Sequence, residues 1–210
     1  MQKTSMLFWI LGIALTLLGV YESFFPSTPA LLFIRLFGLA ALLFTCVSLM
    51  IGPLTVLFPN RFAALIEPRR AVGLSAFVFM LAHFALVLVH VYVYAIELAF
   101  ASLDTTLGTI GFVVFALVAF VSSDYAVKKL GSSWWKRIQQ LTYVAFVIIV
   151  GHFFLSQKGP FIPLGNGQTF IHLAELFLWV LVLATILLQV LGFLAKRKRM
   201  QPPPAHLPPQ

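Results

Sequence analysis

The chain has 210 residues, of which 61% are hydrophobic and only 10% are charged, and its mean hydropathy is +1.01. A soluble domain carries roughly 25% charged residues, so this composition excludes an ordinary soluble protein. The formal net charge of +8 is divided among short segments between apolar runs. That distribution argues against a nucleic-acid-binding protein and points to membrane topology as the reason for the charge.

Six apolar runs are each long enough to cross about 30 Å of hydrocarbon as a helix. They cover about 6–24, 30–58, 71–96, 107–127, 138–156 and 170–195, and the second is expected to break near Gly52 and Pro53. The runs do not alternate polar and apolar residues as barrel strands do. The sequence therefore predicts an all-α, polytopic membrane helix bundle over 1–198, followed by a disordered, proline-rich tail over 199–210.

The first run is interpreted as a retained helix because Glu22, Phe24 and Phe25 follow it, where a signal-peptide cleavage site needs small residues. Basic residues then alternate between loops. The loops after the second and fourth runs and the tail hold most of them: Arg61, Arg69, Arg70, Lys128, Lys129, Lys136, Arg137, Lys196, Arg197, Lys198 and Arg199. Cytoplasmic loops are enriched in Lys and Arg. We therefore predict a multi-pass protein of the inner (plasma) membrane with both termini in the cytoplasm.

Two histidines lie deep inside apolar runs at matching depth. His83 lies twelve residues beyond Ala71 and His152 lies fourteen beyond Ile138, about 18 and 21 Å along helices that run in the same direction. Intramembrane histidine is rare and usually functional. The pair could provide the axial ligands of a haem. Depth alone leaves three alternatives open: a proton relay in a transporter, a haem-free anchoring subunit, and histidines that bond only to backbone.

Several other residues bear on this hypothesis. Cys46 is the single cysteine, so covalent attachment through a pair of cysteines is excluded and any haem would be b-type. His90 shares a helical face with His83 about 10 Å further out, where it would lie near the propionates or at the interface. His172 opens the sixth run as a candidate cofactor contact or an interfacial residue. Arg35 needs an anionic partner, either haem propionates or Glu175.

Two stretches resemble the ferric reductase-like transmembrane domain family. The first is EPRRAVGLSAFVFMLAH, and the second is SSDYAVKKLGSSWWKRIQQLTYVAFVIIVGHF. The second shares with the family a hydroxyl-rich helix end, a basic LG turn, a Trp–Lys–Arg run and a histidine at fixed spacing. The resemblance covers about Gly52 to Phe154, roughly half of the chain.

The resemblance implies a six-helix bundle that carries haem b and transfers electrons to an acceptor outside. It assigns His83 and His152 as iron ligands. Gln139 stands where the family motif has a histidine, so one haem is expected, or two if His90 or His172 completes a second site. The chain has no dinucleotide-binding motif. It is thus expected to act as an oxidoreductase subunit that is embedded in membrane lipid. Its electron donor would be a quinone or a flavoprotein, and its acceptor would be an external reductase or another external partner.

Overall fold

The computed structural model describes residues 2–25, 28–156, 161–164 and 168–200. Its helices are α1 (Gln2–Ser23), α2 (Pro29–Leu57), α3 (Pro59–Phe62), η1 (Ala63–Leu65), α4 (Ile66–His90), η2 (Ile96–Phe100), α5 (Leu103–Phe120), α6 (Asp124–Leu155) and α7 (Leu173–Met200). Six helical segments are long and apolar enough to cross a membrane. The predicted helix bundle is confirmed. Residues 201–210 of the predicted tail lie outside the described residues.

Some local features differ from the sequence prediction. The segment between α6 and α7 contains two short antiparallel strands, β1 (Phe161–Leu164) and β2 (Gln168–Ile171), which pair Ile162 with Phe170. The predicted loop around Lys128 is mostly helical, because α6 begins at Asp124. Gly131 interrupts α6 with φ 76° and ψ 157°, a conformation that is accessible chiefly to glycine. A short basic arm therefore precedes the membrane-length part of α6.

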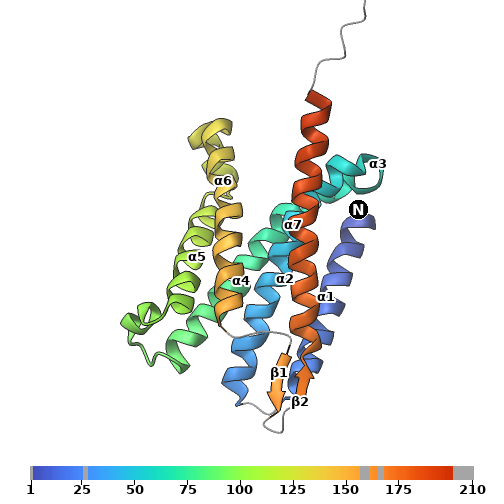
Figure 1. Cartoon of the computed structure of the whole chain (residues 1–210). Coiled ribbons are helices and arrows are strands. Elements are labelled where there is room, and N and C mark those ends of the chain that lie inside the picture. Colours follow the sequence, from blue (N-terminus) through green and yellow to red (C-terminus); the bar gives the residue numbers. More distant parts are fainter. Residues whose placement is uncertain (1, 26–27, 157–160, 165–167, 201–210) are drawn as a thin grey trace, which may run out of the picture.

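α2 is the central helix of the bundle. Half of its most apolar 18-residue stretch is buried, compared with 17–22% in the other five segments. It packs most extensively against α4 and α7, while α5 packs on α6 at the far side of α4 (Figure 1). Thr28 caps the start of α2 by accepting a hydrogen bond from the Leu31 amide, and Pro29 occupies the first turn, where its missing N–H costs nothing.

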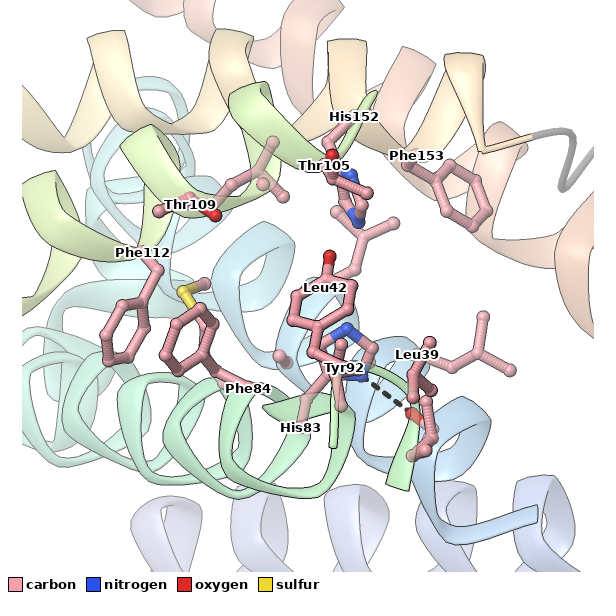
Figure 2. Close-up of a pocket in the computed structure, with 18 residues that line it drawn as sticks. Leu39, Leu42, His83, Phe84, Tyr92, Thr105, Thr109, Phe112, His152 and Phe153 are labelled. Atoms are coloured by element: carbon pink, nitrogen blue, oxygen red, sulfur yellow. Dashed lines mark hydrogen bonds between the residues drawn. The ribbon is translucent and has the colours of Figure 1, made fainter. Parts of the chain in front are cut away.

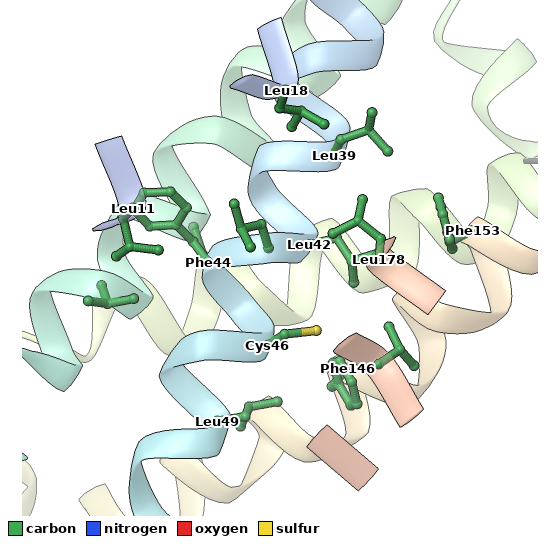
Figure 3. Packing of buried hydrophobic residues seen from close by; sticks show 14 of the residues in the cluster. Leu11, Leu18, Leu39, Leu42, Phe44, Cys46, Leu49, Phe146, Phe153 and Leu178 are labelled. Carbon is green, nitrogen blue, oxygen red and sulfur yellow. The ribbon is translucent and has the colours of Figure 1, made fainter. Parts of the chain in front are cut away.

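The core lies where α2 meets α1, α4, α6 and α7. Leu42, Cys46 and Leu49 from α2 meet Phe146 from α6 and Leu178 from α7 (Figure 3). The outer surface is also apolar, with many large aliphatic and aromatic side chains exposed. Lipid is as apolar as these side chains, so van der Waals packing and hydrogen bonds between helices must hold the bundle together.

The chain ends and the basic segments lie at one end of the bundle. The amino end of α1, the short helix α3, the start of α6 and the carboxyl end of α7 are together there (Figure 1). The β-hairpin and the α4–α5 connection lie at the opposite end (Figure 1). The alternation of basic loops in the sequence thus corresponds to a real polarity of the fold. We call these the basic end and the hairpin end.

The expected break of α2 at Gly52 and Pro53 is wrong, since the helix continues to Leu57. A proline inside a helix leaves the carbonyl four residues earlier without its N–H partner, which here is the carbonyl of Leu49. The Gln189 side chain of α7 donates a 2.7 Å hydrogen bond to that oxygen. Gly192 allows the close approach, because a Cβ there would lie 2.9 Å from Pro53 Cβ.

Replacing Gln189 by leucine should destabilise the bundle, because a buried carbonyl without a partner costs about 1–3 kcal/mol. The free energy of unfolding in mixed detergent micelles measures this loss. Pro53→Ala supplies the missing N–H, so the same Gln189→Leu change should cost clearly less in that background. Equal losses in both backgrounds would show that the Leu49–Gln189 bond does not compensate for Pro53.

Candidate functional site

A cavity of about 260 Å³ lies between α2, α4, α5 and α6, toward the hairpin end. Its walls are mainly apolar and include Leu39, Leu42, Met80, Phe84 and Phe112. His83 on α4 and His152 on α6 both line it, and they enter from opposite sides (Figure 2). The two intramembrane histidines that the sequence placed at equal depth therefore meet at one cavity.

The His83 ring is fixed against α2. Its Nδ1 lies 2.8 Å from the carbonyl oxygen of Ile34. A Cβ on Gly38 would lie 3.0 Å from the same nitrogen, so only glycine leaves room for the ring in this position. Ile34 is the residue four before Gly38, and its carbonyl therefore faces the next turn of α2, where the ring lies.

The His152 ring has the same arrangement against α5. Its Nδ1 lies 2.7 Å from the carbonyl oxygen of Asp104, and a Cβ on Gly108 would lie 2.9 Å from that nitrogen. Asp104 again precedes the glycine by four residues. Both histidines thus use one device: a ring packed on a glycine of the neighbouring helix, with Nδ1 bonded to the carbonyl one turn before. We call this device the glycine–carbonyl seat.

The seats determine the protonation of both rings. A carbonyl oxygen can only accept a hydrogen bond, so each Nδ1 carries the proton and donates it. The lone pair of each neutral imidazole is then on Nε2. A hydrogen bond from the other ring nitrogen is the usual way in which proteins orient a metal-binding histidine and raise its basicity. The donor set therefore fits an iron bound between His83 and His152.

The other walls suit a flat, apolar ring. Phe84 and Phe112 stack with centroids 4.5 Å apart and planes within 7°, and they form one aromatic wall of the cavity (Figure 2). Gly38, Ala41 and Gly108 also line the cavity, and because they are small they fill little of its space. Small residues of this kind let an extended aromatic group approach the helix backbones closely.

Tyr92 is a site residue that sequence reasoning missed. α4 ends at His90, and the turn that follows places Val93 at φ 50° and Tyr94 at φ 66°. A left-handed conformation is unusual for a β-branched residue. The turn directs Tyr92 back over the cavity (Figure 2), where burial raises the pKa of its phenol. No helical periodicity predicts this placement, because it depends on the turn.

The remaining candidates lie away from the cavity lining. His90 is exposed at the end of α4, and Arg35 is exposed on α2 next to Ile34. His172 is buried and packs against Tyr21 and Phe25. Burial, together with the charge of Arg35, lowers the pKa of His172. Its Nε2 also lies 3.5 Å from Oε1 of Glu22.

Two further observations concern the alternatives. Among the described residues, no three His, Cys, Asp or Glu side chains are grouped together. Gln139 lines a different cavity near the basic end and donates a 2.9 Å hydrogen bond to Ser122. It takes no part in the histidine cavity.

Comparison with known proteins finds one matching family and several similar proteins. Residues 37–150 match the family described as ferric reductase like transmembrane component. The chain is 34% identical over 132 residues to the protein-methionine-sulfoxide reductase heme-binding subunit MsrQ of Agrobacterium fabrum, covering 60% of this chain and 59% of that protein. It is 32% identical to the MsrQ of Brucella anthropi over 63% of this chain and 60% of that one.

A third relative is the magnetosome protein MamZ of Magnetospirillum gryphiswaldense, at 27% identity over 81% of this chain but only 26% of that protein. The chain thus spans about 60% of the length of its MsrQ relatives. The family match covers more than half of the chain, and it includes all of α4 with His83 and the part of α6 up to Val150, two residues before His152. This chain is a multi-pass membrane protein that belongs to the ferric reductase-like transmembrane family.

Proposed function

We propose that this chain is a membrane electron-transfer subunit that holds one b-type haem between His83 and His152. A single observation carries the proposal: the two intramembrane histidines line one cavity, each with Nδ1 bonded to a helix carbonyl. Two MsrQ relatives are described as heme-binding subunits, which supports the same cofactor here. Histidine ligation without a cysteine pair corresponds to a non-covalent, b-type haem.

The residues of the cavity have distinct tasks in this proposal. His83 and His152 bind through Nε2, and the seats on Gly38 and Gly108 hold the two rings in position. Phe84, Phe112 and the aliphatic walls exclude water, which favours a low local dielectric. A haem bound by two histidines supplies one-electron transfer with no ligand position open to substrate. The chain itself would therefore carry electrons and leave the substrate reaction to a partner.

The proposed electron donor and acceptor depend on the depth of the histidine cavity in the membrane. By the distribution of Lys and Arg, the basic end would face the cytoplasm, and the histidine cavity would then lie in the outer half of the inner (plasma) membrane. We propose a quinone or a flavoprotein as electron donor and a reductase outside the membrane as acceptor. His90, His172 and Arg35 are all near the hairpin end, and their roles as contacts to the cofactor or the acceptor stay predictions.

The proton-relay alternative is less well supported. A relay needs each histidine to pass a proton to another titratable group. Here each Nδ1–H donates to a backbone carbonyl, and an amide carbonyl cannot be protonated at physiological pH. An optical spectrum separates the two functions, because a haem-free relay has no α-band.

Replacing either histidine by alanine should abolish the low-spin haem spectrum, since a bis-histidine site needs both ligands. The purified wild type should contain about one haem per chain by pyridine haemochrome assay. His206→Ala, in the tail outside the described residues, is the matched control and should keep the wild-type value. Added imidazole should restore haem to a folded His83→Ala protein. A full low-spin spectrum in that variant without imidazole would refute the assignment.

Gly38→Ala and Gly108→Ala should each weaken haem retention, because the new methyl group would lie 3.0 or 2.9 Å from the histidine ring. Overpacking of this kind typically costs about 1–3 kcal/mol. Haem content after dilution into apo-myoglobin, together with the reduction potential, measures the effect. Gly12→Ala is the control, because a Cβ on Gly12 would have nothing within 4 Å. If Gly38→Ala and Gly108→Ala retained haem as well as Gly12→Ala and had the same reduction potential, the seats would not position the ligands.

Reporter fusions should give the orientation. Fusions after Arg70, Arg137 and Arg199 are expected to report cytoplasm, and those at Asp104 and Asn166 the outside. An impermeant oxidant added outside should then reoxidise the reduced protein faster than the same oxidant enclosed in vesicles. Faster oxidation from the inside would contradict the outward direction of electron transfer.

A further inference from the structure

A second cavity, of about 440 Å³, lies between α2, α4, α5 and α6 near the basic end. Arg69 and Gln139 line it, fourteen residues before His83 on α4 and thirteen before His152 on α6. At 1.5 Å per residue these positions are about 20 Å below the histidines. The two cavities are therefore separate levels of the same helix bundle.

Arg69 is held by a carbonyl contact at the corresponding place on α2. Its Nε donates a 3.1 Å hydrogen bond to the carbonyl of Ser48, which is four residues before Gly52. A Cβ on Gly52 would lie 3.5 Å from the Arg69 guanidinium, an ordinary van der Waals contact, so the glycine is not required for space here. The Ser48 hydroxyl in turn donates to the Arg69 carbonyl at 3.2 Å. A helix carbonyl therefore fixes a guanidinium at this level, as a helix carbonyl fixes an imidazole at the other.

The charged side chains that line this cavity are all cationic, and they are joined by neutral hydroxyl, amide and indole groups. Arg69, Arg70 and Lys136 are cationic, and no Asp or Glu is among the described residues that line it. The indole Nε1 of Trp135 is buried and has no hydrogen-bond partner among the described residues. A buried donor in this state costs about 1–3 kcal/mol, so a ligand that accepts a hydrogen bond from it would be stabilised in this cavity.

The rest of the lining is apolar and includes Leu49, Leu74, Phe115 and Val118. A cavity that combines cations and an unpartnered N–H with an apolar wall suits a ligand with an anionic head and an apolar body. Basic pockets between transmembrane helices on the cytoplasmic side commonly bind phosphate head groups. Arginine is well suited to this task, since its planar fork matches phosphate oxygens.

We propose that the cavity of Arg69 and Trp135 binds the phosphate group of an anionic amphiphile. The guanidinium of Arg69 neutralises the charge, Arg70 and Lys136 add positive potential at the entrance, and the Trp135 N–H donates to a phosphate oxygen. The apolar wall contacts the remainder of the ligand. The site is independent of haem binding at the other level, and it makes no demand on the histidines.

Native mass spectrometry of the full chain released from nanodiscs tests this site. Wild-type protein from discs that contain phosphatidylglycerol should retain about one molecule of this lipid and no phosphatidylcholine. Arg69→Gln and Trp135→Phe should each retain it roughly tenfold less, the factor that corresponds to about 1.4 kcal/mol. Arg137→Gln is the control of equal charge change, because Arg137 packs over the Trp134 ring at 5.3 Å and does not line the cavity.

Equilibrium dialysis with inorganic phosphate, in discs of phosphatidylcholine alone, distinguishes a soluble source from a lipid. Saturable phosphate binding that Arg69→Gln and Trp135→Phe both lose would support the site with a soluble phosphate as ligand. Trp135→Phe removes the indole N–H and retains a smaller aromatic ring, so it tests the site even if the arginine variant misfolds. Retention of neither ligand by the wild type, or equal retention by Trp135→Phe and the control, would overturn the proposal.

Discussion

The hydrogen bond from an imidazole N–H to a helix carbonyl, made across a glycine, is the interaction on which the histidine cavity depends. The carbonyls of Ile34 and Asp104 each receive an imidazole in this way. Each already faces a helical N–H, so the added bond needs no break in the helix. The glycine four residues later provides the room. Rings that would otherwise rotate in an apolar layer are therefore fixed in both direction and tautomer.

The sequence was sufficient to predict the six spans and the shared depth of His83 and His152, because helix rise and hydropathy are local properties. It did not predict which side chains from distant segments contact each other. The break expected at Pro53 does not occur because Gln189, far away in the sequence, satisfies the Leu49 carbonyl. The role of Gly108 is visible only when α5 lies on α6. Tyr92 reaches the cavity through a turn with left-handed backbone, which no apolar periodicity encodes.

The two levels differ in the chemistry that they offer. The histidine cavity has two neutral imidazoles whose remaining nitrogens carry lone pairs, so it offers electron-pair donors for a metal. The cavity near the basic end has cations and, among the described residues, an N–H without a partner, so it offers hydrogen-bond donors for an anion. Arginine and glutamine do not ligate haem iron as histidine does. The proposed metal site and the proposed anion site are therefore separated by about four helical turns.

The carbonyl contacts of His83 and Arg69 have a regular spacing on α2 and α4. Ile34 and Ser48 are fourteen residues apart, as are Gly38 and Gly52, and so are His83 and Arg69. Fourteen residues is close to four full turns, so each set returns to the same face of its helix. The antiparallel pair thus repeats one kind of contact, a side-chain N–H on α4 with a carbonyl on α2, at two depths of the bundle. The same contact between the two helices therefore presents an imidazole at one depth and a guanidinium at the other.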